Sequence, residues 1–235
     1  MALRPDATEP GGGHARATSG PGGGPWGILG GTFDPPHHAH LAIAEAARRA
    51  LGLRGVVFVP ARLPPHKLDR DVSDAAERLR MVELAIGGRP GCVVDDLELH
   101  RDGPSYTVDT AEALRQKLGT EGGDPWFILS VEQLWGLPGW HRPQRLVELV
   151  RVAAVPRPGA VAPEEAWFEH HFPGAADRFR LLDGPVLGHS STEIRRLAAA
   201  GEPIDHLVPA AVARHIREHG LYRPAAVPAG ATMER

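Results

Sequence analysis

The sequence has little of the material for covalent crosslinks, membrane insertion or bulk electrostatic binding. Its 235 residues include one cysteine, Cys92, so the chain cannot close an intramolecular disulfide, and we expect a reducing, cytoplasmic setting. A formal net charge of −3 gives no general attraction to nucleic acid or to an anionic membrane. No apolar run reaches the length of a membrane-spanning helix, because the best candidate, 146–155, is interrupted by Glu148 and Arg151. We therefore expect neither a nucleic acid nor a membrane as partner, and a homo-oligomer remains open.

Both ends of the chain lack apolar patterning. The first 25 residues are rich in glycine and proline and have no apolar block of the kind that a secretory signal needs. Residues 224–235 have a similar character. We therefore predict flexible tails over 1–25 and 224–235, and one domain over 26–223 that is large enough to bury a substantial core.

Between the tails, short buried runs alternate with amphipathic stretches. Strands are predicted at 26–29, 55–60, 92–95, 126–130, 150–155 and 179–182. Helices are predicted from His37 or His38 to about 49, from a cap at Ser73 or Asp74 to 86, from a cap at Ser105 to 118, and at 143–149, about 163–171 and 210–219. This alternation predicts an α/β fold with a Rossmann-like, doubly wound, mainly parallel sheet covered by helices on both faces. In such folds, ligands bind beyond the carboxyl ends of the strands.

The most informative stretch is GGTFDPPHHAH at residues 30–40, between the first predicted strand and helix. Its two glycines allow a tight turn, and its two prolines delay the helix until His37 or His38. A helix start offers N–H groups and a partial positive charge, which suit phosphate. His37 and His40 are three residues apart and should project from one face of the first turn. The pattern indicates a phosphate site.

Other interpretations of this pair are weaker. An HxxH pair on a helix can bind zinc, but zinc sites use three or four protein ligands, and the other histidines and Cys92 are scattered in sequence. Solvated histidines in a plain turn remain the simplest alternative. Neither G-x-G-x-x-G nor GK[ST] follows the strand, which excludes a dinucleotide fingerprint and a P-loop.

A second turn, GHSSTEIRR at 188–196, also predicts an anion site. Ser190 and Glu193 have the spacing of a capping box, which leaves Ser191, Thr192 and Arg195 unexplained. Hydroxyls and an arginine on the first turn of a helix are suited to phosphate. The two turns, with the loops at 62–67 and 130–141, all follow strands and can surround one cleft.

Three further features have two interpretations each. The proline-rich loop at 62–67 is either a surface connection or a lid that brings Lys67, with His66, to an anion. Thr107 heads an apolar helical stripe, so its hydroxyl bonds its own helix turn or faces a ligand. Trp140 follows Pro-Gly in a loop, where it is either a core plug or a stacking surface for an aromatic ligand. A fourth feature, the acidic group at 95–98, fits a solvated strand end better than a metal site.

Five ordered pieces of the chain resemble the HIGH-superfamily nucleotidylyltransferases, and specifically the bacterial nicotinate-nucleotide adenylyltransferases. They are GGTFDPPHHAH at 30–40, PPHK at 64–67, PSYT at 104–107, LPGW at 137–140 and SSTEIR at 190–195, with GLYR at 220–223 closing the match. The resemblance implies a nucleotidyltransferase that uses ATP, nicotinate mononucleotide and Mg²⁺ and forms deamido-NAD and pyrophosphate by direct in-line attack. It implies no metal ligands among the protein's own residues.

The resemblance also assigns roles to residues. The catalytic residues would be His37, His40 and Arg195, which hold the triphosphate. Nucleotide would further be bound by Gly31, Thr32 and Phe33, mainly through backbone, and by Ser191 and Thr192. The acceptor would be bound by Lys67, Thr107, Trp140, Ser130 and Glu132, with Trp140 stacking on the nicotinate ring.

Four positions depart from the family pattern. Ala39 replaces the glycine of H-x-G-H, and Ser130 with Glu132 replaces G-x-D after the fourth strand. His141 stands where an aromatic residue is common. These departures keep open a different phosphomonoester acceptor, CTP in place of ATP, or a catalytically weak nucleotide sensor.

Overall fold

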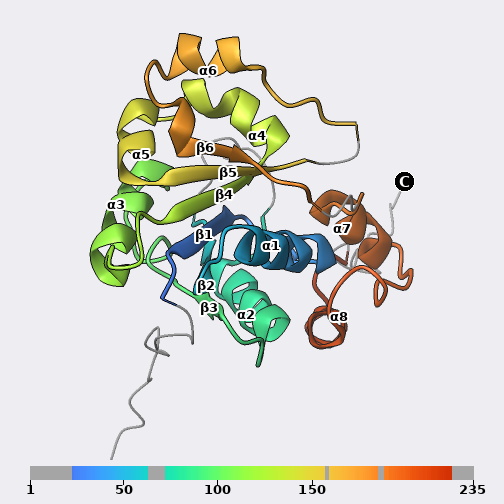
Figure 1. Cartoon of the computed structure of the whole chain (residues 1–235). Coiled ribbons are helices and arrows are strands. Elements are labelled where there is room, and N and C mark those ends of the chain that lie inside the picture. Colours follow the sequence, from blue (N-terminus) through green and yellow to red (C-terminus); the bar gives the residue numbers. More distant parts are fainter. Residues whose placement is uncertain (1–22, 63–71, 157–158, 185–187, 224–235) are drawn as a thin grey trace, which may run out of the picture.

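The computed structural model describes residues 23–62, 72–156, 159–184 and 188–223 (Figure 1). The described part contains a six-stranded parallel sheet in the order β3-β2-β1-β4-β5-β6. The strands are β1 Trp26–Gly31, β2 Gly55–Pro60, β3 Cys92–Val94, β4 Trp126–Ser130, β5 Arg151–Val155 and β6 Phe179–Leu181. The α-helices are α1 His38–Ala50, α2 Ala75–Ile86, α3 Thr107–Leu118, α4 Val131–Gly136, α5 Pro143–Leu149, α6 Glu165–His171, α7 Ser191–Ala199 and α8 Ala210–Glu218.

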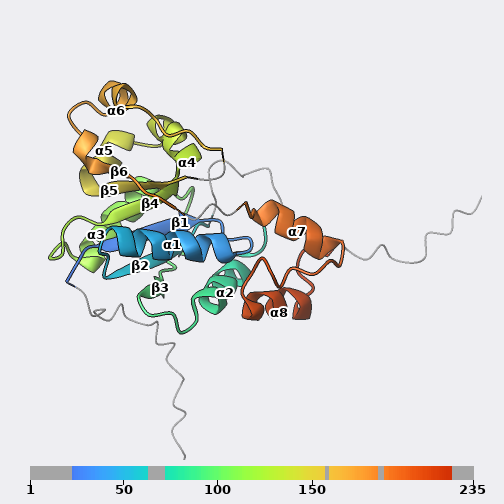
Figure 2. The same cartoon turned by 45° about the vertical axis from the view of Figure 1, so that its right-hand side comes forward.

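Helices cover both faces of the sheet, as the sequence predicts, and Figure 2 shows the two layers from a second direction. Successive residues of β2 point to opposite faces: Val56 and Phe58 join the core that α1, α2, α7 and α8 complete, whereas Val57 and Val59 join the core of α3, α4, α5 and α6. This two-residue alternation is the geometry of an extended strand. All four of these side chains are fully buried, which explains why β2 reads as a continuous apolar run.

The sheet order reverses at the β1/β4 boundary, which is the position where doubly wound folds bind ligands. β1 pairs in parallel with both β2 and β4, and Gly31 at its carboxyl end is aligned with Pro60. Ser130 ends β4 and is aligned with Val155 of β5. The carboxyl ends of these strands therefore form one edge of the sheet.

Two local expectations were wrong. Residues 131–136 form the helix α4 instead of a loop, because Ser130 and Gln133 build a reciprocal cap. The backbone amide of Gln133 donates to Ser130 Oγ at 3.3 Å, and the backbone amide of Ser130 donates to the side-chain oxygen Oε1 of Gln133 at 2.9 Å. Helix α3 begins one residue later than expected: its N-cap is Tyr106, and Ser105 is buried before it.

The expected cap of α7 is only half formed. Ser190 accepts the amide of Glu193 at 3.2 Å, but the Glu193 carboxylate pairs with Arg196 at 2.8 Å instead of returning to the cap. An arginine three residues along the helix is a stronger partner for a carboxylate than a backbone amide. Among the described residues, no helix is both long and apolar enough to cross a membrane.

Candidate active site

The turn between β1 and α1 has a backbone that few sequences permit. Phe33 has a left-handed φ of 50°, and its ring is buried against Phe58 and, edge-on, against His40 at 5.0 Å. A Cβ on Gly31 would lie 3.1 Å from the Phe33 ring, which is tighter than ordinary contact, so glycine fits this position. The chain then enters α1 with His37 as N-cap, as the prolines predict.

The two imidazoles stack on each other at the start of α1. The ring centroids of His37 and His40 are 3.9 Å apart with an interplanar angle of 30°. The His37 amide donates to His40 Nδ1 at 3.2 Å, so a neutral His40 ring carries its proton on Nε2 and presents a donor there. His37 is buried. The pair, together with the helix start, forms a compact group of donors suited to phosphate oxygens.

The second turn contacts the first directly. Ser191 Oγ donates to the carbonyl of Pro35 at 2.9 Å, and Arg195 Nη1 donates to the carbonyl of Asp34 at 2.7 Å. Arg195 Nη2 also lies 3.5 Å from Thr192 Oγ1. Residues separated by about 160 positions in sequence thus meet within three residues of His37. The sequence prediction that these two turns lie together at the carboxyl edge of the sheet is confirmed by these contacts.

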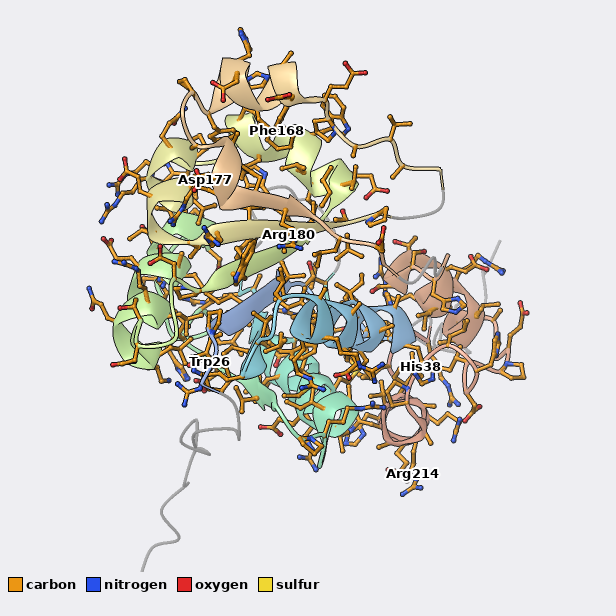
Figure 3. The ribbon with its side chains drawn as sticks, viewed as in Figure 1. Trp26, His38, Phe168, Asp177, Arg180 and Arg214 are labelled. Carbon is orange, nitrogen blue, oxygen red and sulfur yellow. The ribbon has the colours of Figure 1, made fainter. Side chains whose placement is uncertain are left out.

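The N-terminal end of α1 lies against the segment before α8. The His38 amide donates to the carbonyl of Leu207 at 3.0 Å, and Figure 3 labels His38 at this end of the helix. Partial burial lowers the pKa of His38, and the neighbouring Arg89 and His189 side chains lower it further. His38 is therefore largely neutral at pH 7 and adds little charge beside the pair of His37 and His40.

Arg78 on α2 is a buried residue next to the histidine turn that the sequence did not reveal. Its side chain is 1% exposed, and its guanidinium donates to four backbone carbonyls: Thr32, Ala61, Arg62 and Ser73. Burial lowers the pKa of Arg78, and the nearby Asp34 carboxylate opposes that shift. One cation thereby ties the turn after β1 to the segment after β2. In the sequence, Arg78 stands in a charged helical stretch and gives no signal of burial.

The buried Asp34 carboxylate is the second missed residue. Its Oδ1 accepts the Tyr222 hydroxyl at 2.8 Å, and its Oδ2 accepts the Ser73 amide at 3.2 Å. Burial raises the pKa of Tyr222, and the adjacent Asp34 carboxylate raises it further, so the phenol remains a neutral donor. The GLYR segment near the end of the described chain therefore fixes the turn that carries the histidines.

Two of the residues expected on the acceptor side, Trp140 and Thr107, lie in segments that contact each other, and Trp140 also contacts β4. Trp140 is half-buried and packs edge-on against Phe127 of β4, with ring centroids 6.0 Å apart. Thr107 is half-buried at the first position of α3, on the same face as the buried Ala111 and Leu114. His141 stacks on Tyr106 at 4.2 Å, which joins the two segments. The imidazole of His141 therefore stacks on Tyr106 at a position where another aromatic side chain would also stack.

The remaining predicted positions differ in their environment. Ser130 is buried and caps α4, whereas Glu132 is exposed on that helix. Ala39 is also buried, so its methyl group is not presented at the surface of the turn. His66 and Lys67 lie outside the described residues, as do the predicted tails apart from residues 23–25.

The acidic group at 95–98 is not a solvated strand end, contrary to expectation. Asp95 and Glu98 are buried. Asp95 binds Lys117 Nζ at 2.6 Å, and Glu98 accepts the hydroxyl of Thr110. Burial raises the pKa of Glu98. Each carboxylate is therefore paired with a residue of α3, and the two pairs connect the segment after β3 to that helix.

The chain is similar to known proteins over most of its length. The family model described as cytidylyltransferase-like matches residues 28–197. A protein of Dehalococcoides mccartyi, named a probable nicotinate-nucleotide adenylyltransferase, is 42% identical over 196 residues, covering 83% of this chain and 96% of the relative. One of the same name from Thermomicrobium roseum is 39% identical over 197 residues, covering 84% and 91%.

Solved structures extend the similarity at the level of the fold. Nicotinic acid mononucleotide adenylyltransferase of Plasmodium falciparum, solved in complex with APC, superposes with a TM-score of 0.65 at 18% identity, covering 85% of this chain and 97% of the other. The same protein in complex with NaAD gives a TM-score of 0.66 at 19% identity and the same coverage.

Proposed function

Because the chain belongs to the nicotinate-nucleotide adenylyltransferase family, we propose that it transfers the adenylyl group of ATP to nicotinate mononucleotide. A phosphate oxygen of the mononucleotide attacks the α-phosphorus of ATP, and the bond from that phosphorus to the bridging oxygen breaks. Pyrophosphate leaves with the electron pair, and the new P–O–P linkage is deamido-NAD. The use of ATP supports the cytoplasmic location expected from the sequence, which stays a prediction.

The observation that carries the proposal is the contact between the two anion-suited turns. Arg195 and Ser191 bind carbonyls of Asp34 and Pro35, immediately before the histidine pair. A triphosphate is long enough to contact donors on both turns. The reaction needs no protein nucleophile, so catalysis reduces to aligning two anions and stabilising the charge that develops on the leaving group. Preformed donors supply this stabilisation without reorganisation.

We propose the following division of roles. Nε2 of His40 and the imidazole of His37 donate to the triphosphate at the reacting phosphorus, while Thr192 and Arg195 hold its outer phosphates. Gly31, Thr32 and Phe33 meet the nucleotide through backbone groups. The left-handed backbone of Phe33 supports this role, because it turns the chain sharply at the sheet edge.

We propose that Mg²⁺ enters bound to the phosphates of ATP. The described groups at the histidine turn are imidazoles, hydroxyls and a guanidinium, and the Asp34 carboxylate there already accepts bonds from Tyr222 and Ser73. Mg²⁺ prefers oxygen ligands and commonly binds through substrate phosphates and water. The ion therefore belongs to the substrate, and its removal with EDTA should stop turnover.

We propose that the nicotinate ring of the acceptor stacks on Trp140, beside Thr107. Trp140→Ala should therefore raise KM for nicotinate mononucleotide by about tenfold, the effect of losing an aromatic stack worth about 1–1.5 kcal/mol, while KM for ATP changes less than twofold. Steady-state kinetics with each substrate varied in turn provide the test. Trp135→Ala is the matched control, because Trp135 is an exposed tryptophan on the neighbouring helix α4. A larger change in KM for ATP than for the acceptor would contradict the stacking role.

The proposed reaction is tested with a panel of acceptors and donors. Purified protein is incubated with ATP or CTP, Mg²⁺ and one phosphomonoester at a time, and pyrophosphate release is measured. We expect kcat/KM to be highest for nicotinate mononucleotide with ATP. A preference for another acceptor or for CTP would replace the proposed substrates, which the departures at Ser130, Glu132 and His141 make a specific alternative. No pyrophosphate from any pair, with folded protein that binds ATP, would favour a nucleotide sensor.

A further inference from the structure

A second cluster of titratable side chains lies between α2 and α8. The two helices pack side by side, as both ribbon views show (Figures 1 and 2). Between them is a cavity of about 590 Å³. Glu77, His215 and His219 line it together with Arg80, Arg214 and Glu218. None of these residues has a role in the proposed transfer reaction.

The first three residues form a compact donor set. One nitrogen of each histidine and one carboxylate oxygen of Glu77 all lie within 4.8 Å of one another. His215 Nε2 is 2.6 Å from Glu77 Oε2. The two histidines are four residues apart at the C-terminal end of α8, with ring centroids 4.0 Å apart. Residues at this spacing lie on one helix face, so both rings can bind the same ion.

The geometry is close to that of a tetrahedral zinc site. Zn–N and Zn–O bonds of about 2.0–2.1 Å place neighbouring ligand atoms about 3.3 Å apart. The observed separations, from 2.6 Å to at most 4.8 Å, bracket this value. Small side-chain rotations would therefore bring all three atoms to one ion, which replaces the hydrogen bond between His215 and Glu77. Two histidines and a glutamate are a known ligand set for zinc with an open fourth position.

A backbone contact orients one of the ligands in advance. His219 Nδ1 lies 3.0 Å from the carbonyl oxygen of His215. A carbonyl oxygen only accepts, so Nδ1 carries the proton and Nε2 of the neutral ring keeps a lone pair. Histidines that bind metal commonly donate their other ring N–H to such an acceptor, which fixes the tautomer and the ring orientation. His219 has this arrangement although it is exposed.

The glutamates and arginines that line the cavity carry no net positive charge that would repel a cation. The two glutamates that line the cavity balance the two arginines, and Arg80 is also paired with Glu83 at 3.0 Å. Arg214 lies on α8, as Figure 3 shows. His215 is buried, so little further desolvation of its ring is needed when an ion binds.

We propose that Glu77, His215 and His219 form a binding site for Zn²⁺ or a similar imidazole-seeking divalent cation, separate from the catalytic turn. The ion links α2 to α8. Glu77 immediately precedes Arg78, which binds the carbonyls around the catalytic turn, and α8 leads into Tyr222, which binds Asp34. Bound metal therefore stabilises the two elements that hold that turn, because an ion that binds only the folded state adds to its stability.

The test uses the full chain without a histidine tag, stripped of metal by a chelator. Zn²⁺ is titrated calorimetrically, Co²⁺ is added to a second sample to record its visible spectrum, and melting temperature is measured with and without Zn²⁺. We expect one Zn²⁺ per chain, the intense visible bands of tetrahedral Co²⁺, and a melting temperature that rises with Zn²⁺. His219→Ala and Glu77→Gln should each weaken Zn²⁺ binding by more than about tenfold, the least that losing even an outer partner of a metal ligand usually costs.

Two control variants separate this site from other histidines. His170→Ala removes an exposed histidine on α6, and His40→Ala disrupts the catalytic pair. Both should bind Zn²⁺ within about twofold of the parent chain. The proposal is overturned if the parent chain binds no Zn²⁺, if His219→Ala and Glu77→Gln bind it as the parent does, or if only His40→Ala loses it. Circular dichroism of the metal-free variants establishes that each one is folded.

Discussion

His40→Ala should lower kcat by about 10²-fold or more, which corresponds to about 2.7 kcal/mol of transition-state stabilisation. Because the His37 amide donates to Nδ1 of His40, the neutral His40 ring carries its proton on Nε2, and we propose that Nε2 donates to the triphosphate in the reaction. Alanine retains the helix start but removes this donor, so the loss should fall mainly on kcat and less on KM for ATP. His37→Ala should have a similar effect on kcat. Steady-state kinetics with saturating acceptor give both parameters.

The control for this variant is His170→Ala, which changes an exposed histidine on α6 and should keep kcat within a factor of about two. Thermal melting of both variants separates chemistry from folding, because His40 also packs against Phe33 and His37. A His40→Ala protein that melts near the parent temperature and turns over at the parent rate would remove the imidazole pair from the mechanism.

Arg78→Met should lower the free energy of unfolding by about 3–5 kcal/mol, the range seen when one member of a buried charged network is removed. Methionine is similar in length but has no donors, so four carbonyls and the buried Asp34 carboxylate lose their cation. Chemical denaturation monitored by tryptophan fluorescence measures the change. We expect kcat to fall as well. Without the guanidinium, Arg78 no longer holds the carbonyl of Thr32, so the turn that carries the histidines is less firmly positioned.

Arg80→Met is the matched control on the same helix. Arg80 is exposed and pairs with Glu83, so its loss should change stability by no more than about 0.5 kcal/mol. If the Arg78 and Arg80 variants unfold at the same denaturant concentration, the buried guanidinium contributes little to stability and does not hold the turn after β1 in place. Arg78→Lys provides a graded comparison, because one ammonium cannot reach every carbonyl that the guanidinium fork does.

The sequence predicts the fold and much of the site because those features follow from local chemistry. The two prolines before His37 place the helix start correctly, and the alternation of strands and helices predicts the parallel sheet. The rule that ligands bind at the carboxyl edge predicts that the Ser191–Arg195 turn meets the histidine turn, which it does. The α4 helix was missed although Ser130 and Gln133 have the spacing of a capping box.

Other features depend on tertiary packing and have no local signature. Arg78 follows Glu77 on a charged helix, and nothing in the sequence distinguishes the buried residue from the exposed Arg80. Asp34 reads as a turn residue until Tyr222 is seen to bind it. Likewise, the pairing of Glu77 with His215 joins helices far apart in the chain. The assignments of nucleotide and acceptor contacts to individual residues stay predictions that the kinetic variants test.

The bond between Tyr222 and Asp34 joins residues 188 positions apart in sequence, and it has a consequence for biosynthesis. A nascent chain emerging from the ribosome completes β1 and the histidine turn early, but the partners of that turn on α7 and at Tyr222 are translated only after all six described strands. Native pairing over such long separations is intrinsically slow. A chain truncated before Tyr222 would carry the histidine turn without the hydroxyl that binds Asp34, and we expect such a chain to release pyrophosphate more slowly than the full chain.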